Sequence, residues 1–347
     1  MTGPRVALVS GFWGQNVGNA FFNLGGRRLL EEAGCAVSFV QDMPAYATFR
    51  NERRGNYPNA FPLLDHLDVD VVVLQGPLFT VNFANIWRAQ LERLAERGVG
   101  WAVLGGAFRK YVAEEKQVAR EVVADVPPRF LSTRDRPSAE MLAGLATPCR
   151  SGLDSAFFLP EAFEPPSMRT DFVTFTFDHY PEPRLTPDPA GAIAIGDALL
   201  SPRHRALGEW AARRSKAHAM ASRIGGRPNR LPAEIAGIPI VRPDHRTNPH
   251  LPFKIYKDAN SIASDDPWTY LTLYANTSLT YSDRVHACVA TIAYGRPAMF
   301  RNPGTRRSVL FEAAGCRSIA TEPSTMSEEL RCDEFGVTAD FVRRVLE

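Results

Sequence analysis

The sequence lacks the features that mark several large classes of protein. Only five of its 347 residues are cysteine, and they form neither a CxxC pair nor a Cys/His spacing typical of metal ligands. Scattered cysteines in odd number are typical of a reducing compartment. The apolar stretch 6–9 is too short for a secretion signal or a membrane span. We therefore expect a cytoplasmic protein with no integral membrane segment and no metal.

An excess of charge of one sign is also absent. The chain has 40 Lys and Arg against 38 Asp and Glu, a net charge of +2, which provides no overall field for nucleic acid. Arginine greatly outnumbers lysine, which suits planar recognition of phosphate or carboxylate, although GC-rich codon usage produces the same bias. Any anion site must therefore be local, and we expect small-molecule partners and no nucleic acid.

The first half of the chain alternates short apolar stretches with helical patterns. The predicted strands are residues 6–10, 36–40, 69–74, 101–104 and 130–133. The clearest helix is 83–97, where Ile86, Leu91 and Leu94 form an apolar stripe and Gly98 can end the helix. Apolar strands separated by helices predict a parallel sheet covered on both faces. This half is predicted to be Rossmann-like.

The Pro-rich stretch 159–167 is the predicted linker, dividing the chain into domains at 1–164 and 165–347. In the second domain we expect a strand at 172–177, helices at 203–223 and 267–276, and a strand, turn, helix and strand over 277–301. Two stretches, 42–62 and 225–251, have the composition of surface loops or lids. The predicted fold is α/β, with two Rossmann-like domains facing each other across a cleft.

Ligands of parallel α/β sheets bind beyond the carboxyl ends of strands, so the turns at those ends are the candidate site. Residues 11–19, GFWGQNVGN, contain Asn16, Gly18 and Asn19 before a predicted helix, and such a turn can receive an anion. A glycine-rich tight turn with Asn caps explains this segment equally well. The spacing is not that of a dinucleotide site, and no P-loop lysine follows. Weaker candidates are Gln75 with Gly76, and Gly105 with Gly106.

The most informative turn is Tyr281-Ser282-Asp283-Arg284-Val285-His286. Ser282 or Asp283 is the predicted N-cap of a helix, so Arg284 and His286 lie near its first turn. The positive end of a helix disfavours imidazolium and favours anions, which keeps His286 nearer the neutral form that a base requires. Arg284 can bind phosphate or carboxylate. Alternatively, Arg284 pairs with a carboxylate and His286 only packs.

Other strand ends supply second candidates. Arg134 and Asp135 follow the strand 130–133, where a structural contact is the alternative to a binding role. His179 follows the strand 172–177. His245 and His250 lie in an Arg- and Pro-rich stretch that reads as a solvated loop rather than a metal site.

Several of these segments together resemble the polysaccharide pyruvyl transferase family. The segments are 16–19 (NVGN), 132–135 (STRD) with Ser138, 153–157 (LDSAF) and 282–300 (SDRVHACVATIAYGRPAMF). The Arg-x-His pair of the last segment, followed by Gly295 and Pro297, is the most specific part. The resemblance implies a GT-B-like fold and a transferase that moves the pyruvyl group of phosphoenolpyruvate onto sugar hydroxyls, forming a ketal.

By this resemblance Arg284 and His286 are the catalytic pair, and no cofactor is required beyond the donor substrate. The expected substrate-binding residues are Asn16, Gly18, Asn19, Gln75, Gly76, Gly105, Arg134, His179, Ser282, Asp283 and Arg306. The acceptor would be a sugar or a lipid-linked glycan of exopolysaccharide biosynthesis.

The sequence departs from the family pattern at three places. Asn19 stands where an acid is common, Gln75-Gly76-Pro77 replaces a Gly-Gly-Gly turn, and Arg306 or Arg307 replaces a late lysine. Two alternatives therefore remain. One is a GT-B-like glycosyltransferase using a nucleotide sugar, and the other is a noncatalytic glycan-binding member of the family.

Overall fold

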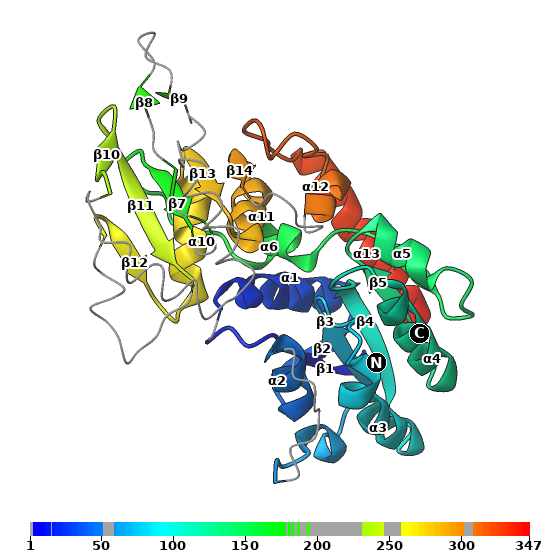
Figure 1. Cartoon of the computed structure of the whole chain (residues 1–347). Coiled ribbons are helices and arrows are strands. Elements are labelled where there is room, and N and C mark those ends of the chain that lie inside the picture. Colours follow the sequence, from blue (N-terminus) through cyan, green and yellow to red (C-terminus); the bar gives the residue numbers. More distant parts are fainter. Residues whose placement is uncertain are drawn as a thin grey trace.

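We analysed a computed structural model of the chain. It describes residues 3–14, 16–50, 59–177, 180, 182–183, 186–187, 193–194, 231–245, 258–301 and 308–347. The predicted helix 203–223 therefore lies outside the described residues. The described elements form two α/β units, each built on a largely parallel sheet (Figure 1).

The first unit contains a six-stranded parallel sheet in the order β2-β1-β3-β4-β5-β6. Its strands are β1 (Arg5–Val9), β2 (Ala36–Val40), β3 (Val71–Gln75), β4 (Gly100–Gly106), β5 (Leu131–Thr133) and β6 (Cys149–Ser151). Alternate residues of the central strands enter two separate cores, one on each face of the sheet. Burial on both faces explains why these strands read as uninterrupted apolar runs. All five strands predicted in this half are confirmed, whereas the short β6 was missed.

Helices cover both faces of this sheet. They are α1 (Gly18–Glu32), α2 (Met43–Arg50), α3 (Phe83–Glu96), α4 (Ala113–Asp125) and α5 (Arg136–Leu142), with short 3-10 turns η1 (Leu63–His66) and η2 (Ser155–Phe158). The helix predicted at 83–97 is confirmed as α3, and Gly98 follows its end with a φ of +75°, the left-handed conformation that glycine adopts most easily.

The second unit has a mixed sheet in the order β10-β11-β7-β13-β14, with β12 beside β11. Its strands are β7 (Val173–Thr176), β10 (Glu234–Ile235), β11 (Ile238–Asp244), β12 (Ser261–Ala263), β13 (Leu279–Ser282) and β14 (Ala298–Phe300). Its helices are α10 (Pro267–Asn276), α11 (Val285–Ala293) and α12 (Val309–Ala313), and a separate two-stranded ribbon pairs β8 (Thr186–Pro187) with β9 (Ile193–Ala194). The predicted unit 277–301 is confirmed as β13, α11 and β14.

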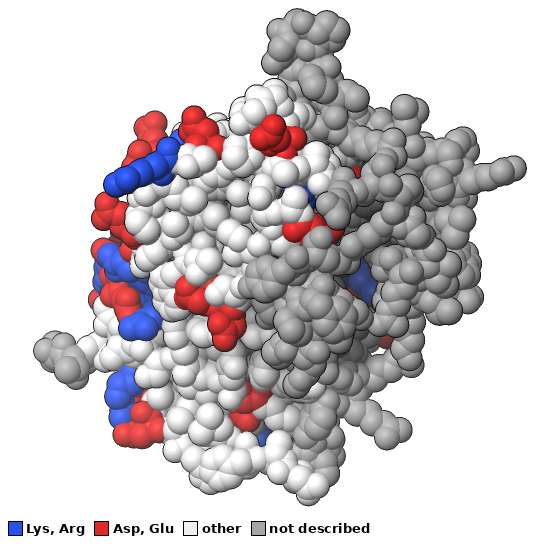
Figure 2. Space-filling model, turned by 90° about the vertical axis from the view of Figure 1, so that its left-hand side faces the viewer, with Lys and Arg blue, Asp and Glu red and all other residues white. Residues whose placement is uncertain are grey.

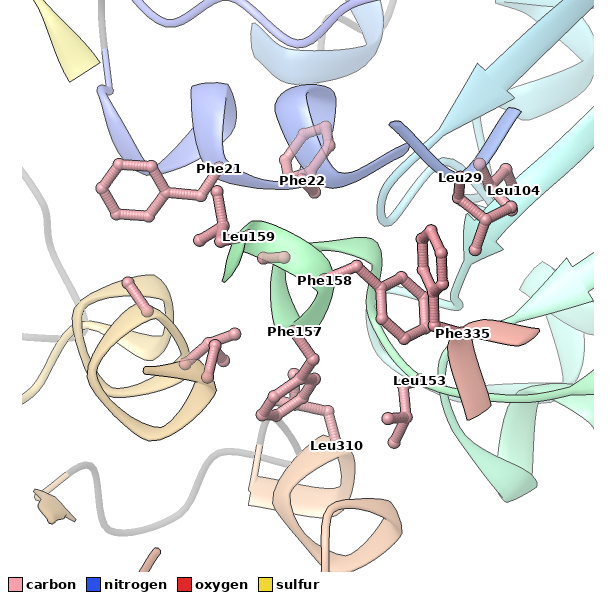
Figure 3. Close-up of a cluster of buried hydrophobic side chains, with 14 of the residues drawn as sticks. Phe21, Phe22, Leu29, Leu104, Leu153, Phe157, Phe158, Leu159, Leu310 and Phe335 are labelled. Carbon is pink, nitrogen blue, oxygen red and sulfur yellow. The ribbon is translucent and has the colours of Figure 1, made fainter. Parts of the chain in front are cut away.

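Helix α1 lies between the two units (Figure 1). Its side chains Phe21, Phe22 and Leu29 belong to the same buried cluster as residues of η2, α10 and α11. Figure 3 shows Phe157, Phe158 and Leu159, from η2 and the short helix α6 (Leu159–Ala162), packed below α1 and reaching toward α12 and the C-terminal helix. One hydrophobic core therefore joins both units.

Two adjacent glycines in α1 permit this close packing. A Cβ at Gly25 would overlap with the carbonyl oxygen of Ser155 in η2, and a Cβ at Gly26 would overlap with Oε1 of Gln75. Glycine in a helix interior lowers stability relative to alanine. Gly25 and Gly26 therefore do not favour the helix itself, and what they provide is room for the neighbouring segments. The backbone of α1 thereby touches η2 directly.

The last helix, α13 (Glu328–Leu346), packs back on the first unit against α1 and η2 (Figure 1). Arg150 of β6 donates to Glu334 at 2.6 Å, and Arg343 donates to the carbonyl oxygen of Glu32 at 2.9 Å. The strands of the first sheet all precede residue 164 and those of the second all follow it. Because α13 returns to the first unit, the domain boundary at 164/165 stays a prediction.

Two predicted loops contain regular structure and are corrected here. Stretch 42–62 includes α2, and the carbonyl oxygen of Asp42 accepts the N–H of Tyr46 at 3.0 Å, the first i to i+4 hydrogen bond of the helix. Stretch 225–251 includes β10 and β11, an antiparallel hairpin that turns at Ala236 and Gly237, both with positive φ. The prolines in both stretches had suggested loops, yet Pro44 and Pro239 lie within regular elements.

Among the described residues, no helix is long and apolar enough to cross a membrane.

We predict opposite effects for two glycine-to-alanine substitutions in helices. Gly25→Ala places a methyl group against Ser155 and should lower the free energy of unfolding by about 1–3 kcal/mol. Gly336→Ala in α13, where a Cβ meets open space, should raise it by about 0.5–1 kcal/mol. Urea unfolding of both variants measures the difference. A Gly25→Ala protein as stable as the parent would show that α1 does not need this close approach.

Candidate active site

The turn between β13 and α11 is buried and held by the neighbouring strand. Ser282 donates its hydroxyl to the carbonyl oxygen of Thr176 at 2.7 Å, and its Oγ accepts the backbone N–H of Arg284 at 2.9 Å. Asp283 is 1% exposed and accepts the backbone N–H of Tyr180 at 2.8 Å. The N-cap of α11 is Arg284, not Ser282 or Asp283 as predicted, because a bend at Asp283 follows β13 and the helix begins only at Val285.

This turn meets the turn that follows β1 in the first unit. Nη1 of Arg284 donates to Oδ1 of Asn16 at 3.3 Å, and Arg284 is only 7% exposed. At Gly18 an ideal Cβ would lie 3.1 Å from Nδ1 of His286, so α1 begins directly against the imidazole ring. The carboxyl ends of strands from both sheets therefore converge on Arg284 and His286.

His286 also faces an ion pair from the first unit. Its Nε2 lies 3.9 Å from Oδ2 of Asp154, and the same oxygen accepts from Nη1 of Arg134 at 2.7 Å. Arg134 and Asp154 are 11% and 2% exposed. Among the described residues no atom is within hydrogen-bonding distance of His286 Nε2.

Asp154 remains a carboxylate despite its burial. Burial alone would raise the pKa of Asp154. His286, Arg134 and the backbone N–H of Ala156 lower it by more than burial raises it, so the pKa lies well below its usual range. The group that faces His286 is therefore negatively charged at neutral pH. Arg134 and His286 both face this carboxylate.

The structure places the remaining candidates around α1. Gln75 is buried and neither of its amide atoms has a hydrogen bond within the described part of the chain. Gly76 is buried with a φ of +82°, and a Cβ there would lie 3.4 Å from the ring of Phe49 and 3.5 Å from that of Phe22. Gly105 lies beside the hydroxyl of Ser155, next to Asp154. Asn19 donates to the carbonyl oxygen of Phe12 at 3.0 Å and accepts from Asn16 at 3.3 Å.

Two predicted site residues, His179 and Arg306, lie outside the described residues. Most of the others fall into two groups. A series of contacts joins Asn16, Gly18, Arg134, Arg284 and His286 with Asp154, whereas Gln75 and Gly76 lie further along α1 against Gly26 and Phe22.

Two residues of this region were not assigned a role from the sequence. Asp154 is the carboxylate partner of His286, and its position in the LDSAF segment was the available signal. His245 was expected in a solvated loop, which is wrong, since it is 2% exposed. It forms a hydrogen bond with the hydroxyl of Tyr274, and its carbonyl oxygen accepts the N–H of Val17, next to Asn16, at 3.1 Å.

The cationic groups of the site are internal, not part of a surface patch. On the face shown in Figure 2, described basic and acidic side chains are mixed along one edge, and isolated acidic residues lie over the rest. Arg134 and Arg284, by contrast, are almost fully buried. Charges in such an environment act more strongly on a bound anion than exposed charges do. No group of three or more His, Cys, Asp and Glu with metal-ligand geometry occurs among the described residues.

A sequence model of the polysaccharide pyruvyl transferase family matches residues 16–303, which include every described residue of this site. The chain belongs to that family. It is accordingly a transferase, and the resemblance based on the Arg-x-His segment is confirmed. A search of curated proteins found no match.

Solved structures support the fold. A candidate UDP-N-acetylglucosamine 2-epimerase from Listeria monocytogenes has a TM-score of 0.50 and 12% identity, with 99% of this chain and 91% of that chain covered. Another UDP-N-acetylglucosamine 2-epimerase has a TM-score of 0.50 and 10% identity, with 100% and 95% covered. At these identities the likeness shows the fold alone. This pyruvyl transferase family member therefore has two Rossmann-like domains in a GT-B-like arrangement.

Asp154→Asn should destabilise the protein at neutral pH by about 3–5 kcal/mol, because Arg134 would remain buried without its counter-charge. A carboxylate whose pKa is lowered by folding stabilises the protein above its unfolded pKa, about 4, and this stabilisation is lost as pH falls through the folded pKa. The destabilising effect should therefore shrink in acid. Urea unfolding at several pH values measures it.

The matched control is Asp70→Asn. The Asp70 side chain is 47% exposed and pairs with exposed Arg5, so the substitution should change stability little at any pH. Equal effects of the two substitutions at neutral pH would contradict the structural role of Asp154.

Proposed function

We propose that this chain transfers the pyruvyl group of phosphoenolpyruvate onto two hydroxyls of a sugar or glycan precursor, forming a cyclic ketal. The observation that carries the proposal is the convergence of Arg284, His286 and the buried Arg134–Asp154 pair at strand ends of both sheets. Membership of the family supplies the class of reaction. The arrangement supports an anionic donor and an acid/base residue at one place.

The donor carries a phosphate and a carboxylate, which require cationic groups. Arg284 is buried at the start of α11, where the helix dipole adds positive potential. Nη1 of its guanidinium donates a hydrogen bond to Oδ1 of Asn16, which belongs to the first unit. We expect Arg284 to bind the donor, with the turn at residues 16–19 positioning the guanidinium and Arg134 contributing positive charge behind Asp154.

His286 is the proposed general acid/base. Asp154 remains ionised and can stabilise the imidazolium form when the ring carries a proton. Gly18 and Phe22 pack against the ring, whose centroid lies 5.5 Å from that of Phe22. The ring is therefore held in position while its protonation changes.

The steps balance without a cofactor. The first sugar hydroxyl adds to C2 of phosphoenolpyruvate and loses its proton, while C3 gains a proton and becomes a methyl group. The C2–O bond to phosphate then breaks, the second hydroxyl attacks C2, and its proton leaves with the phosphate. His286 is placed to carry one proton from oxygen to carbon.

The partners in this proposal are phosphoenolpyruvate and a sugar or lipid-linked glycan of exopolysaccharide biosynthesis, and the location is cytoplasmic. All five cysteines are free thiols, which supports a reducing compartment. Asn19 does not argue against the reaction, because it holds the turn by one donated and one accepted hydrogen bond.

The direct test is mass spectrometry of candidate acceptors incubated with the protein and phosphoenolpyruvate. The expected product has the mass of the acceptor plus pyruvate minus one water. His286→Ala should lower the rate of phosphate release by about 10²–10⁴-fold, because the proton carrier is lost. Thermal unfolding should confirm that the variant is folded, since the side chain is partly exposed at 15%.

Normal turnover by folded His286→Ala would remove His286 from the mechanism. His66→Ala is the control, since that histidine belongs to η1 of the first unit and stacks on exposed Phe61. It should release phosphate at the parent rate.

Arg284→Lys should weaken phosphoenolpyruvate binding by about 10–100-fold, because a lysine cannot replace a planar guanidinium that contacts both Asn16 and an anion. The rise in melting temperature on adding phosphoenolpyruvate measures this. Arg136→Lys, at an 86% exposed arginine, is the control and should keep the full rise. Protection of the parent protein only by nucleotide sugars would instead favour a glycosyltransferase.

A further inference from the structure

A separate pocket lies beside the turn that holds Asn16. It has a volume of about 360 Å³ and is lined by Phe12, Gln41, Asp42, Met43, Tyr46 and Ala60. These residues come from the carboxyl end of β2, from α2, from the β1–α1 turn and, for Ala60, from the connection between α2 and η1. The pocket is shallow and open to solvent, so a ligand would lie against its walls rather than inside a closed cavity.

The walls combine aromatic rings with hydrogen-bonding groups. Phe12 and Tyr46 meet edge to face, with ring centroids 5.3 Å apart. The apolar C–H faces of a sugar ring pack on such rings, while its hydroxyls require polar neighbours at the edge. Gln41 and Asp42 are those neighbours.

Asp42 has acceptor capacity beyond its structural bonds. One carboxylate oxygen accepts the N–H of Met43 at 2.7 Å and the other accepts the N–H of Leu64 at 3.2 Å. A carboxylate has about four acceptor positions, so about two remain for hydroxyl donors. Gln41 is exposed and donates one amide N–H to the carbonyl oxygen of Gly11 at 3.1 Å, while its amide has further donor and acceptor capacity.

The described lining residues of the pocket combine two aromatic rings with one carboxylate and one amide. These groups offer ring faces and hydrogen-bonding atoms at one place, which suits a hydroxyl-rich ligand.

One continuous turn connects the pocket to Arg284. Phe12 lines the pocket, its carbonyl oxygen accepts from Asn19, Asn19 accepts from Asn16, and Asn16 accepts from Arg284. The ring of Phe22 touches both Gly11, next to Phe12, and the ring of His286. This packed side chain occupies the space between the pocket wall and His286.

We propose that the pocket binds one sugar ring of an acceptor glycan, adjacent to the ring that receives the pyruvyl group. The identification of its occupant as an acceptor rests on the function proposed above. Because Phe22 keeps the pocket ring away from His286, the site favours an acceptor of at least two sugar units. A monosaccharide occupies only one of the two positions.

The test compares p-nitrophenyl hexosides with the matching disaccharide glycosides. Saturation-transfer NMR measures their binding without any donor. The parent protein should bind a disaccharide more tightly than its monosaccharide, and Tyr46→Ala and Phe12→Ala should weaken disaccharide binding by about tenfold. Tyr46→Phe keeps the ring and should retain binding.

Trp268→Ala is the control for loss of a large aromatic side chain, because Trp268 is 41% exposed on α10 and does not line the pocket. It should bind the disaccharide like the parent. Absence of disaccharide binding to the parent, or undiminished binding to both alanine variants, would overturn the proposal.

Failure of the reaction itself is recognised separately. If no acceptor gains mass with phosphoenolpyruvate although the disaccharide binds and Tyr46→Ala weakens it, the pocket is a sugar site and the pyruvyl transfer is wrong. If product forms but its acceptor KM is the same in parent and Tyr46→Ala, the transfer holds and the pocket proposal fails.

Discussion

The contact between α1 and the segment 153–159 holds the site together. Gly25 lets the helix backbone touch Ser155, and Phe157 and Phe158 then fill the core that both units share. Asp154 immediately precedes Ser155, and Gly18 begins α1, so the same contact sets Asp154 and Gly18 against His286. A dense hydrophobic interface thus determines the position of a polar site.

The electrostatics follow from that burial. Two arginines, Arg134 and Arg284, and two carboxylates, Asp154 and Asp283, are nearly removed from water. Charges so placed act on one another and on a bound ligand more strongly than exposed charges do. The hydrogen bonds among Asn16, Asn19 and Phe12 add no charge while fixing the turn. An acid at position 19 would lose the donor to Phe12, which gives a local reason for the amide in this chain.

The sequence predicted most strands of the first sheet and the unit 277–301, because apolar runs and Gly-Pro breaks report local structure directly. Loops were wrongly predicted where prolines lie inside regular elements, as at Pro44 in α2 and Pro239 in β11. The pairing of Asp154 with both Arg134 and His286 was not predictable, since it joins residues that are distant along the chain. His245 was misread for the same reason. Its burial results from packing against Phe21 and Tyr274, which no local pattern shows.

The shared core also limits how substrates can enter. Two Rossmann-like domains with separate cores can swing apart at low cost, but here α1 contributes apolar side chains to both units. Separating them would expose that surface at about 25 cal/mol per Å². The C-terminal helix adds a second attachment through Arg150, Glu334 and Arg343. Substrates therefore reach the imidazole of His286 at a lower free-energy cost when the turns at the strand ends rearrange than when the two units separate about a hinge. The shared core keeps the two units at a fixed distance from each other.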